Sequence, residues 1–279
     1  EALIDKIINK SDYNFINYLG GAPANVVCAL RKLNVPTAFI GCVGDDDFGK
    51  EFIKLFQKLN VNIDFLQVTK KYSTRIVKVI RDESGDRSFS GFEVTKFNAF
   101  ADEMLDQLLI INNKKNLKKQ FSNTKYIVTG TNALASPKSA ESLNFVLDFA
   151  KNFKIKIIID VNWREIFWEK FDINKDNQFK KVIEFLDHAD ILKLANEEAY
   201  LFFDTNDPFE ISKVLAKQPD VIITNGANPI NWYLNGMKGY NEIVKNSSKI
   251  IDTTGAGDAF LAGLISRYYF DLNLMIIQK

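Results

Sequence analysis

The residues with the clearest chemical potential lie near the end of the chain, in the stretch DTTGAGDAF at 252–260. Its Gly-Ala-Gly turn runs into Asp258 and then into apolar residues at every fourth position, the spacing of one helix face: Phe260, Leu264 and Tyr268. The first N–H groups of a helix lack intrahelical acceptors and lie at the positive end of the helix dipole, so they attract anions. The turn therefore predicts an anion site with a carboxylate beside it.

A second glycine-rich stretch, LGGAPANVVCALRKLN at 19–34, predicts a ligand contact at another helix start. Gly20 and Gly21 allow the backbone to approach a ligand closely, and Pro23 favours a helix that begins there. Asn25 falls in the first turn of that helix. Its amide can donate and accept hydrogen bonds at once, as a sugar hydroxyl requires, although helix capping would use the same residue type.

The stretch GDDDFGKE at 44–51 resembles a phosphate-binding P-loop, but two features exclude that function. Glu51 occupies the position where a hydroxyl group would hold magnesium, and three neighbouring aspartates would repel a triphosphate. A loop rich in carboxylates suits hydroxyl groups instead. This favours a sugar as the ligand, with Asp47 as a candidate contact.

Short apolar strands alternate with helical patterns, which predicts an α/β fold with a mostly parallel sheet and helices on both faces. Strands are expected at 37–44, 125–130, 154–160, 189–195 and 220–226, and helices at 49–59, 136–153, 178–189 and 196–203. Residues 62–97 break this alternation and predict a set of adjacent antiparallel strands. We expect one domain over 1–279, with a small lid formed by about 6–19 and 62–97.

Ligands of open α/β sheets bind beyond the carboxyl ends of the strands, so polar residues that follow predicted strands are candidates for a site. They are Gly41, Gly44 to Asp47, Gly130, Asn132, Asp160, Asn162, Arg164, Asn196 to Glu198 and Thr224 to Gly226. Each of them alone could serve a turn or a helix cap. Their repetition after strand upon strand predicts a shared ligand site.

Composition restricts the classes of function. The 279 residues are 46% hydrophobic and carry a formal net charge of +1, which argues against nucleic acid or an anionic membrane as the partner. Cys28 and Cys42 lack metal-site spacing and are expected to be buried, reduced thiols. The sequence has no apolar run long enough to predict a membrane span, so we expect a cytoplasmic protein. The chain has no initiator methionine and stops soon after its last predicted helix, so we expect a truncated C-terminus.

Several of these stretches resemble a known family. GGAPAN, GCVGDDDFG and DTTGAGDAF are similar to the two signature regions of the ribokinase-like sugar kinases, also called the phosphofructokinase B family, and the likeness covers nearly the whole chain. YLGGAPANV, RDESGDRSFSGF and IIIDVNWREIFW look most like bacterial fructokinases. The resemblance implies a ribokinase-like fold, with a mostly parallel central sheet, helices on both of its faces and a small β-sheet lid.

The resemblance also implies the roles of the chemical groups. Backbone N–H groups of Gly255, Ala256 and Gly257 would form an anion hole for the phosphoryl group that leaves ATP. Asp258 would accept the proton of the attacking sugar hydroxyl, and Arg164 would contact the transferring phosphate. Phosphoryl transfer needs mainly such positioning and charge stabilisation.

The remaining roles carry over residue by residue. In the family, sugar contacts would come from Asp5, Gly20, Gly21, Asn25 and Asn162. The nucleotide and its Mg²⁺ with bound water would be held by Thr224, Gly226, Asn196 and Glu198. Asp252 and Thr254 resemble the edge of a monovalent-cation site, which would take K⁺.

The chain departs from the family pattern at two positions. Ala195 stands where the family's magnesium motif has asparagine, with Asn196 beside it, and Pro229 stands where the nucleotide loop has a later glycine.

The resemblance implies phosphorylation of D-fructose at O6 by MgATP. The alternatives are a kinase for ribose, a nucleoside or a 2-keto-3-deoxy sugar acid, for which Arg75, Arg81 or Arg87 could supply a cation, and a non-catalytic sugar-binding relative. Relatives often form homodimers by pairing their lids.

Overall fold

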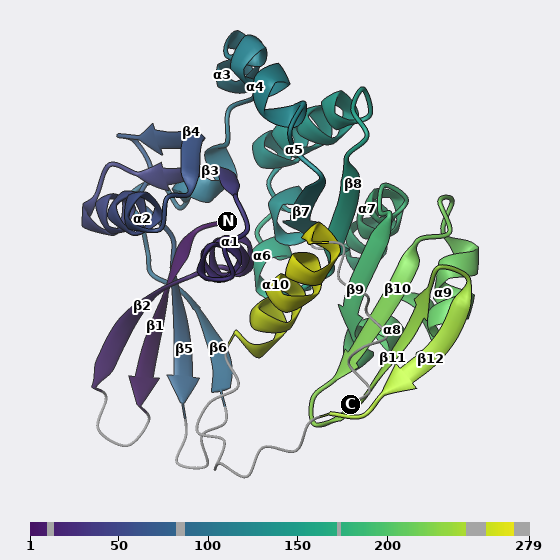
Figure 1. The fold of residues 1–279 in the computed structure, drawn as a ribbon. Helices are drawn as coiled ribbons and strands as arrows, with labels where there is room; N and C mark the ends of the chain where they lie inside the picture. The colour runs from purple at the N-terminus through teal and green to yellow at the C-terminus, as the bar shows by residue number, and fades with distance from the viewer. Residues whose placement is uncertain (10–13, 82–86, 172–173, 244–254, 271–279) are drawn as a thin grey trace. The chain divides into compact units, whose positions relative to one another are not determined.

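The computed structural model describes residues 1–9, 14–81, 87–171, 174–243 and 255–270. These residues belong to two compact units, one made of Glu1–Leu105 with Ile250–Lys279 and the other of Asp106–Lys249. We call them the first and the second unit and describe each by itself (Figure 1). Within the described residues, no helix combines the length and the apolar character that crossing a bilayer would require.

The first unit contains a four-stranded sheet in the order β2-β1-β5-β6. Its strands are β1 (Leu3–Asn9), β2 (Phe15–Gly20), β5 (Ile76–Arg81) and β6 (Arg87–Phe92). β1 pairs antiparallel with β2 and parallel with β5, while β5 and β6 are antiparallel. This sheet corresponds to the predicted lid, and we call it the lid sheet.

One part of the lid prediction is wrong. The strand β4 (Asn62–Thr69) lies outside the lid sheet and pairs in parallel with β3 (Ala38–Gly44). Its burial explains the difference, because Phe65 is buried and Ile63 and Leu66 pack on the apolar core. Turn residues and short apolar runs do not distinguish an antiparallel lid strand from a strand that joins the core.

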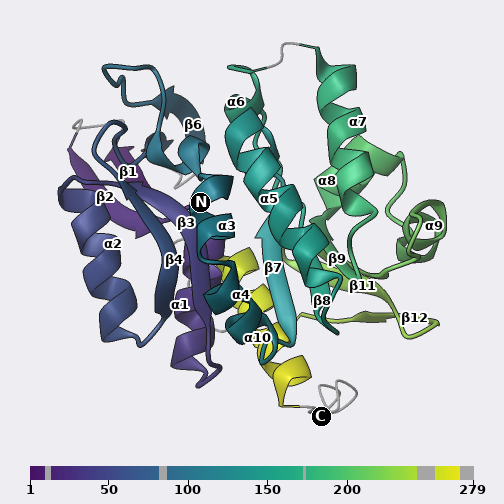
Figure 2. The ribbon, with the colours of Figure 1, turned by 90° about the horizontal axis from the view of Figure 1, so that it is seen from above.

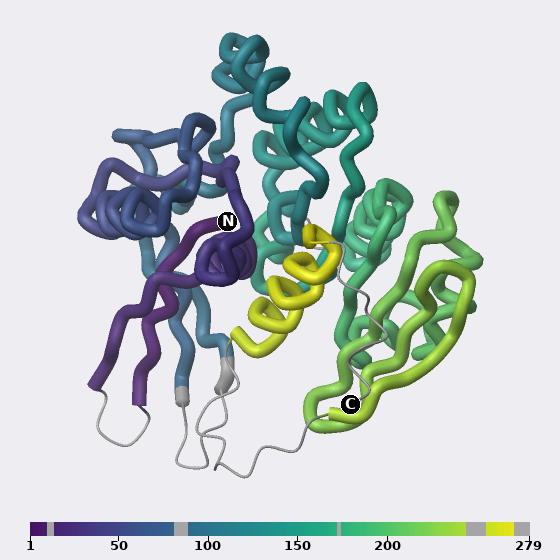
Figure 3. The backbone as a smooth tube through the Cα atoms, viewed as in Figure 1, coloured from purple at the N-terminus to yellow at the C-terminus, as the bar shows by residue number. Residues whose placement is uncertain are grey.

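The helices of the first unit are α1 (Ala22–Lys32), α2 (Asp47–Lys58) and α10 (Ala256–Tyr269), with a short 3-10 turn at Ala101–Met104. α1 and α10 lie side by side although they are far apart in sequence (Figure 3). The core of this unit joins β1, α1, β3 and α2 through Ala2, Ile4, Ala24, Val27, Phe39, Val43, Phe52, Phe56 and Val61.

The second unit is built on a six-stranded mixed sheet in the order β12-β11-β10-β9-β8-β7. Its strands are β7 (Tyr126–Gly130), β8 (Lys156–Asp160), β9 (Ile191–Ala195), β10 (Asp220–Asn225), β11 (Asn228–Leu234) and β12 (Met237–Asn241). β7 to β10 are parallel, as predicted, and β11 and β12 add an antiparallel edge. The runs IIID and VII in β8 and β10 are buried throughout, which is the pattern of strands covered on both faces.

The helices of this unit follow the predicted alternation with shifted ends. They are α3 (Gln107–Asn112), α4 (Lys114–Phe121), α5 (Pro137–Ala150), α6 (Glu165–Trp168), α7 (Lys175–Leu186), α8 (Asn196–Phe203) and α9 (Pro208–Val214). α5 begins at Pro137 after Ser136, as the proline predicted. α8 packs on β9 and β10, and α9 on β10 and β11.

Candidate active site

The carboxylate of Asp258 lies in the first turn of α10, as the sequence predicted. Gly255 is the N-cap and has φ of 74°, a left-handed conformation that favours glycine. The hydrogen bond from the N–H of Ala259 to the carbonyl of Gly255, at 2.8 Å, is the first turn of the helix. The N–H groups of Ala256, Gly257 and Asp258 precede that bond, so they are the donors without an intrahelical acceptor. Asp258 is half-buried, and Ala256 and Gly257 are exposed.

The buried face of α10 differs from the predicted one. The buried residues are Leu261, Ala262, Leu264 and Ile265, whereas Phe260 and Tyr268 are only half-buried. The every-fourth-residue pattern correctly predicted a helix, but the buried face includes Leu261 and Ile265 rather than Phe260 and Tyr268. Because the helix is apolar on most of its surface, spacing alone does not determine which face packs.

Asn25 from α1 contacts Asp258 directly. Its Nδ2 atom donates a hydrogen bond to Asp258 Oδ2 at 2.8 Å, across 233 residues of sequence. The packing of α1 against α10 brings the two side chains together. The two glycine-rich stretches identified in the sequence therefore meet in the first unit.

Asp5, Gly20 and Gly21 form a tight corner in front of α1. A methyl group on Gly20 would collide with the Asp5 carboxylate, so the absence of a side chain at Gly20 lets Asp5 lie against the backbone. Gly21 is the N-cap of α1 with φ of 93°, and a Cβ there would lie 3.0 Å from the carbonyl oxygen of Glu1. Both glycines are required by close approach within the chain itself, in addition to any ligand.

The carboxylate-rich loop before α2 is partly structural. Asp46 caps α2 by accepting from the N–H of Gly49 at 2.8 Å, and it also accepts from the backbone and hydroxyl of Thr74 at 2.7 and 2.9 Å. Asp47 is 99% exposed and lies near Lys50, 3.8 Å away. The expectation that this loop meets sugar hydroxyls therefore does not apply to Asp46, whose oxygens already accept three hydrogen bonds inside the first unit.

In the second unit, the predicted residues gather at the carboxyl edge of the parallel strands. Strand register pairs Gly130 with Asp160, Asp160 with Lys193, and Ala195 with Thr224. Lys193 Nζ donates to Asp160 Oδ1 at 2.8 Å, and both side chains are buried. We call Asp160, Asn162, Arg164, Lys193 and Glu198 the sheet-edge cluster.

Glu198 fastens two backbone segments of this cluster. Its two carboxylate oxygens accept from the N–H of Trp163 at 2.7 Å and from the N–H of Ala195 at 2.8 Å. Burial raises the pKa of Glu198, and the nearby Asp160 carboxylate raises it further, while the two N–H groups and Lys193 oppose this shift. Carboxylate oxygens are the hard ligands that Mg²⁺ prefers, and the magnesium role of Glu198 stays a prediction.

The loop that carries Arg164 is held by an aromatic cluster. The ring of Trp163 lies 5.0 Å from that of Trp168, 5.7 Å from that of Phe179 and 5.3 Å from that of Phe202, between centroids. These rings come from the loop before α6 and from α6, α7 and α8, which are labelled in Figure 2. Arg164 is half-buried and donates from Nη1 to the Trp163 carbonyl at 2.8 Å. Asn162 has φ of 41°, so the backbone is left-handed at this residue.

The predicted nucleotide contacts lie close by in the same unit. Asn196 opens α8, and its Oδ1 accepts from Asn206 Nδ2 at 3.1 Å. Thr224 is the last residue of β10 that pairs with β9, and its hydroxyl lies 3.4 Å from the Leu194 carbonyl. Gly226, with φ of 54°, makes the turn between β10 and β11. Asp252 and Thr254, the predicted cation ligands, lie outside the described residues.

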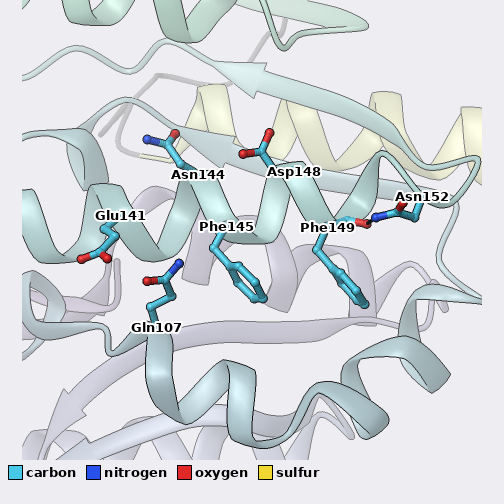
Figure 4. A pocket seen from close by; sticks show the side chains of 7 residues that line it. All are labelled: Gln107, Glu141, Asn144, Phe145, Asp148, Phe149 and Asn152. Carbon is cyan, nitrogen blue, oxygen red and sulfur yellow. Dashed lines mark hydrogen bonds between the residues drawn. The ribbon is translucent and has the colours of Figure 1, made fainter.

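A separate hollow of about 470 Å³ lies on α5. Figure 4 shows its lining residues, Gln107, Glu141, Asn144, Phe145, Asp148, Phe149 and Asn152. The rings of Phe145 and Phe149 stack there at 6.1 Å. None of the predicted site residues that the structure describes lines it.

Comparison with known proteins assigns the chain to a family. The family described as pfkB family carbohydrate kinase matches residues 7–273. The chain belongs to the pfkB family of carbohydrate kinases. Its fold is accordingly ribokinase-like, as a structural comparison also indicates: the fructokinase of Xylella fastidiosa, solved with bound ATP, has a TM-score of 0.82 at 25% identity, over 96% of this chain and 79% of the other.

Two sequence relatives illustrate the identity and the coverage of the match between this pfkB-family chain and known proteins. It is 28% identical to the fructokinase of Vibrio alginolyticus, over 95% of this chain and 81% of that protein. It is also 28% identical to an Arabidopsis thaliana protein named probable fructokinase-6, chloroplastic, over 92% of this chain. The match spans 64% of the length of that plant protein.

One residue of this pfkB-family site escaped the sequence reasoning. Lys193 lies inside the strand β9, where it is a single charged residue within an apolar run. The signal that could have identified it is its place two residues before the strand end, since a charged residue inside a buried strand must find a partner. Asp160, in the equivalent position on the neighbouring strand, is that partner.

Proposed function

We propose that the protein is an ATP-dependent fructokinase, which transfers the γ-phosphoryl group of ATP to the hydroxyl at carbon 6 of D-fructose. The observation that carries this proposal is the position of Asp258 in the first turn of α10, three residues after the left-handed Gly255 and next to N–H groups that attract anions. Fructokinases among the relatives of this chain support fructose as the substrate.

The residues of the first unit would handle the sugar. Asp258 would accept the proton of the attacking hydroxyl while the N–H groups of Gly255, Ala256 and Gly257 stabilise the charge on the phosphoryl group. Asp5, Gly20, Gly21 and Asn25 would bind the other hydroxyls. The lid sheet would exclude water, which otherwise competes with the sugar for the phosphoryl group.

The residues of the second unit would handle the nucleotide. Arg164 would contact the transferring phosphate as a planar cation with several donors, and Asn162 would assist it. Thr224, Gly226 and Asn196 would contact ATP. Glu198 would hold Mg²⁺ through bound water, and the metal would neutralise phosphate charge. Asp252 and Thr254 would bind K⁺.

The structure weighs against one route to an alternative substrate. A sugar acid requires a cation, and Arg75 was one candidate. Arg75 is 4% exposed and paired with Asp102 at 3.0 Å and with Glu103 at 3.0 Å, and its guanidinium lies over the rings of Phe92 and Phe100. Its charge is already compensated inside the first unit, which favours a neutral sugar such as fructose.

The experiment is a coupled assay of ADP release with a panel of sugars: fructose, ribose, a nucleoside and a 2-keto-3-deoxy sugar acid. We expect fructose to give the highest kcat/KM and its product to be fructose 6-phosphate by mass and by NMR of carbon 6. A higher kcat/KM for another sugar would reassign the substrate. Absence of transfer to every sugar would overturn the kinase proposal.

We also propose that two copies associate through their lid sheets. β2 is an edge strand of this sheet, and its residues Phe15, Ile16 and Tyr18 are exposed, as is Phe89 of β6. Apolar side chains gathered on one small sheet are unfavourable in water and typical of surfaces that pair.

A further inference from the structure

We propose that Asn25 is a positioning residue for the catalytic carboxylate as well as a sugar contact. The hydrogen bond from its Nδ2 to Asp258 Oδ2, at 2.8 Å, fixes one oxygen of the carboxylate and so its rotation toward the attacking hydroxyl. This inference rests on the proposed kinase function. It assigns Asn25 a role in the rate of transfer, which sugar binding alone does not require.

Both side chains project from helices that packing holds in place. In α1, the N–H of Asn25 donates to the Gly21 carbonyl at 2.9 Å, and the residues Ala24, Val26, Val27 and Leu30 are buried. In α10, Leu261, Ala262, Leu264 and Ile265 are buried. Since α1 packs against α10, the amide is presented to the carboxylate by fixed backbones on both sides. A geometry set in this way is the kind that preorganises a reacting group.

The chemistry of the amide allows both roles. A side-chain amide has two N–H donors and a carbonyl acceptor, and the contact with Asp258 uses one donor. The other donor and the acceptor are enough to bind a sugar hydroxyl. An aspartate at this position would still accept from sugar hydroxyls but could not donate to Asp258, so Asn25→Asp separates the two roles.

The test compares Asn25→Ala and Asn25→Asp with wild type in the sugar kinase assay. The matched control is Cys28→Ala, which trims a half-buried side chain of the same helix one turn further on. We expect kcat to fall about tenfold to a hundredfold in Asn25→Ala, because a misplaced reacting group costs that much. In Asn25→Asp it should fall at least as far, since two carboxylates then repel each other. In Asn25→Asp, which still accepts from sugar hydroxyls, the Kd for fructose from calorimetry should change much less than kcat, and Cys28→Ala should keep wild-type kcat.

A double-mutant cycle with Asp258→Asn tests whether Asn25 acts through the carboxylate. If it does, Asn25→Ala lowers kcat in the wild-type background but not in the Asp258→Asn background. Equal losses in both backgrounds, or wild-type kcat in Asn25→Asp, would overturn the positioning role. Circular dichroism and thermal unfolding check that each variant is folded.

The wild-type rate in the same assay separates this inference from the proposed function. Transfer to a sugar other than fructose would overturn the fructose assignment, and the cycle would then be measured with that sugar. No transfer to any sugar would overturn both the kinase function and the role of Asn25.

Discussion

Two carboxylates define the candidate site, and their surroundings suit different tasks. Asp258 is half-buried and accepts a hydrogen bond from a neutral side-chain amide. Glu198 is buried, and its oxygens accept from two backbone N–H groups that belong to different segments. The first is the residue that we propose as the proton acceptor, and the second joins the Trp163 loop to the start of α8.

Replacement of Asp258 by asparagine should slow turnover strongly and leave the protein folded. The side chain keeps its size but can no longer accept a proton, and a general base contributes about 10² to 10⁴ in rate. We expect kcat to fall by about that factor, with fructose binding by calorimetry retained. A kcat within severalfold of wild type would show that another group accepts the proton.

The raised pKa of Glu198 predicts how its contribution to stability depends on pH. Between the ordinary value of 4.5 and the raised value, the folded protein holds a proton that the unfolded chain has released, so this group lowers the free energy of unfolding as pH rises. Glu198→Gln lacks this effect. We expect the difference in unfolding free energy, variant minus wild type, to increase as pH rises above 4.5, measured by urea unfolding.

The control for this prediction is Glu197→Gln, on the exposed side of the same helix turn. The glutamine at position 198 also loses one of the two backbone hydrogen bonds, but that loss is the same at every pH. A difference between Glu198→Gln and wild type that stays constant with pH would contradict the prediction.

At the scale of elements, the start of α10 is the critical feature. A left-handed Gly255 turns the chain so that the following N–H groups emerge together, and α1 then supplies Asn25 from beside them. In the second unit, the aromatic rings around Trp163 pack beside the loop that carries Arg164. The Lys193–Asp160 ion pair joins β9 to the end of β8, just before that loop. Asp258 and Trp163, the neighbour of Arg164, are thus each contacted by side chains from other elements.

The glycines of α10 predict opposite effects of one substitution. Among the residues that the structure describes, no atom lies within 4 Å of a Cβ built on Gly255 or on Gly263, so steric space does not distinguish the two positions. Gly255 has φ of 74°, whereas Gly263 lies within the helix. Gly255→Ala should therefore destabilise the protein by about 1 to 2 kcal/mol, and Gly263→Ala should stabilise it by about 0.5 to 1 kcal/mol.

Chemical unfolding of the two variants measures both signs, and kinase assays add a second readout. Gly255→Ala should also lower kcat, because the N–H groups that follow it would turn away from the phosphoryl group. Equal stability of the two variants would mean that the left-handed turn is not required.

At the scale of the whole molecule, the predicted chemistry is divided between the two units. Asp258, Asn25 and Asp5 belong to the first unit, and Arg164 and Glu198 belong to the second. The first unit also carries the lid sheet, whose exposed apolar residues are the basis of the proposed dimer.

The lid surface predicts the oligomeric state. Ile16 and Tyr18, which are 56% and 50% exposed, lie on the edge strand β2, and lysine at such positions is a common barrier to strand pairing. We expect a homodimer by analytical ultracentrifugation, and a monomer for the double variant Ile16→Lys and Tyr18→Lys. Lys238→Ala, on the edge strand β12 of the other unit, is the control. A monomeric wild type would dispose of the lid dimer.

The sequence by itself predicted the family, the parallel strands β7 to β10 and the position of Asp258 at a helix start. These features are local: apolar runs, a proline before a helix, and glycines where the backbone must turn are read from neighbouring residues. The match of the pfkB family to residues 7–273 confirms the resemblance carried by these stretches.

Tertiary structure decided what the side chains contact. The partner of Lys193, the pairing of β4 with β3, the buried face of α10 and the contact between Asn25 and Asp258 all depend on segments that are distant in sequence. A residue's neighbours in the chain do not determine which distant group meets it, because packing selects among many partners of similar chemistry. The sequence therefore predicted which residues belong to the candidate site, but not which side chains contact one another.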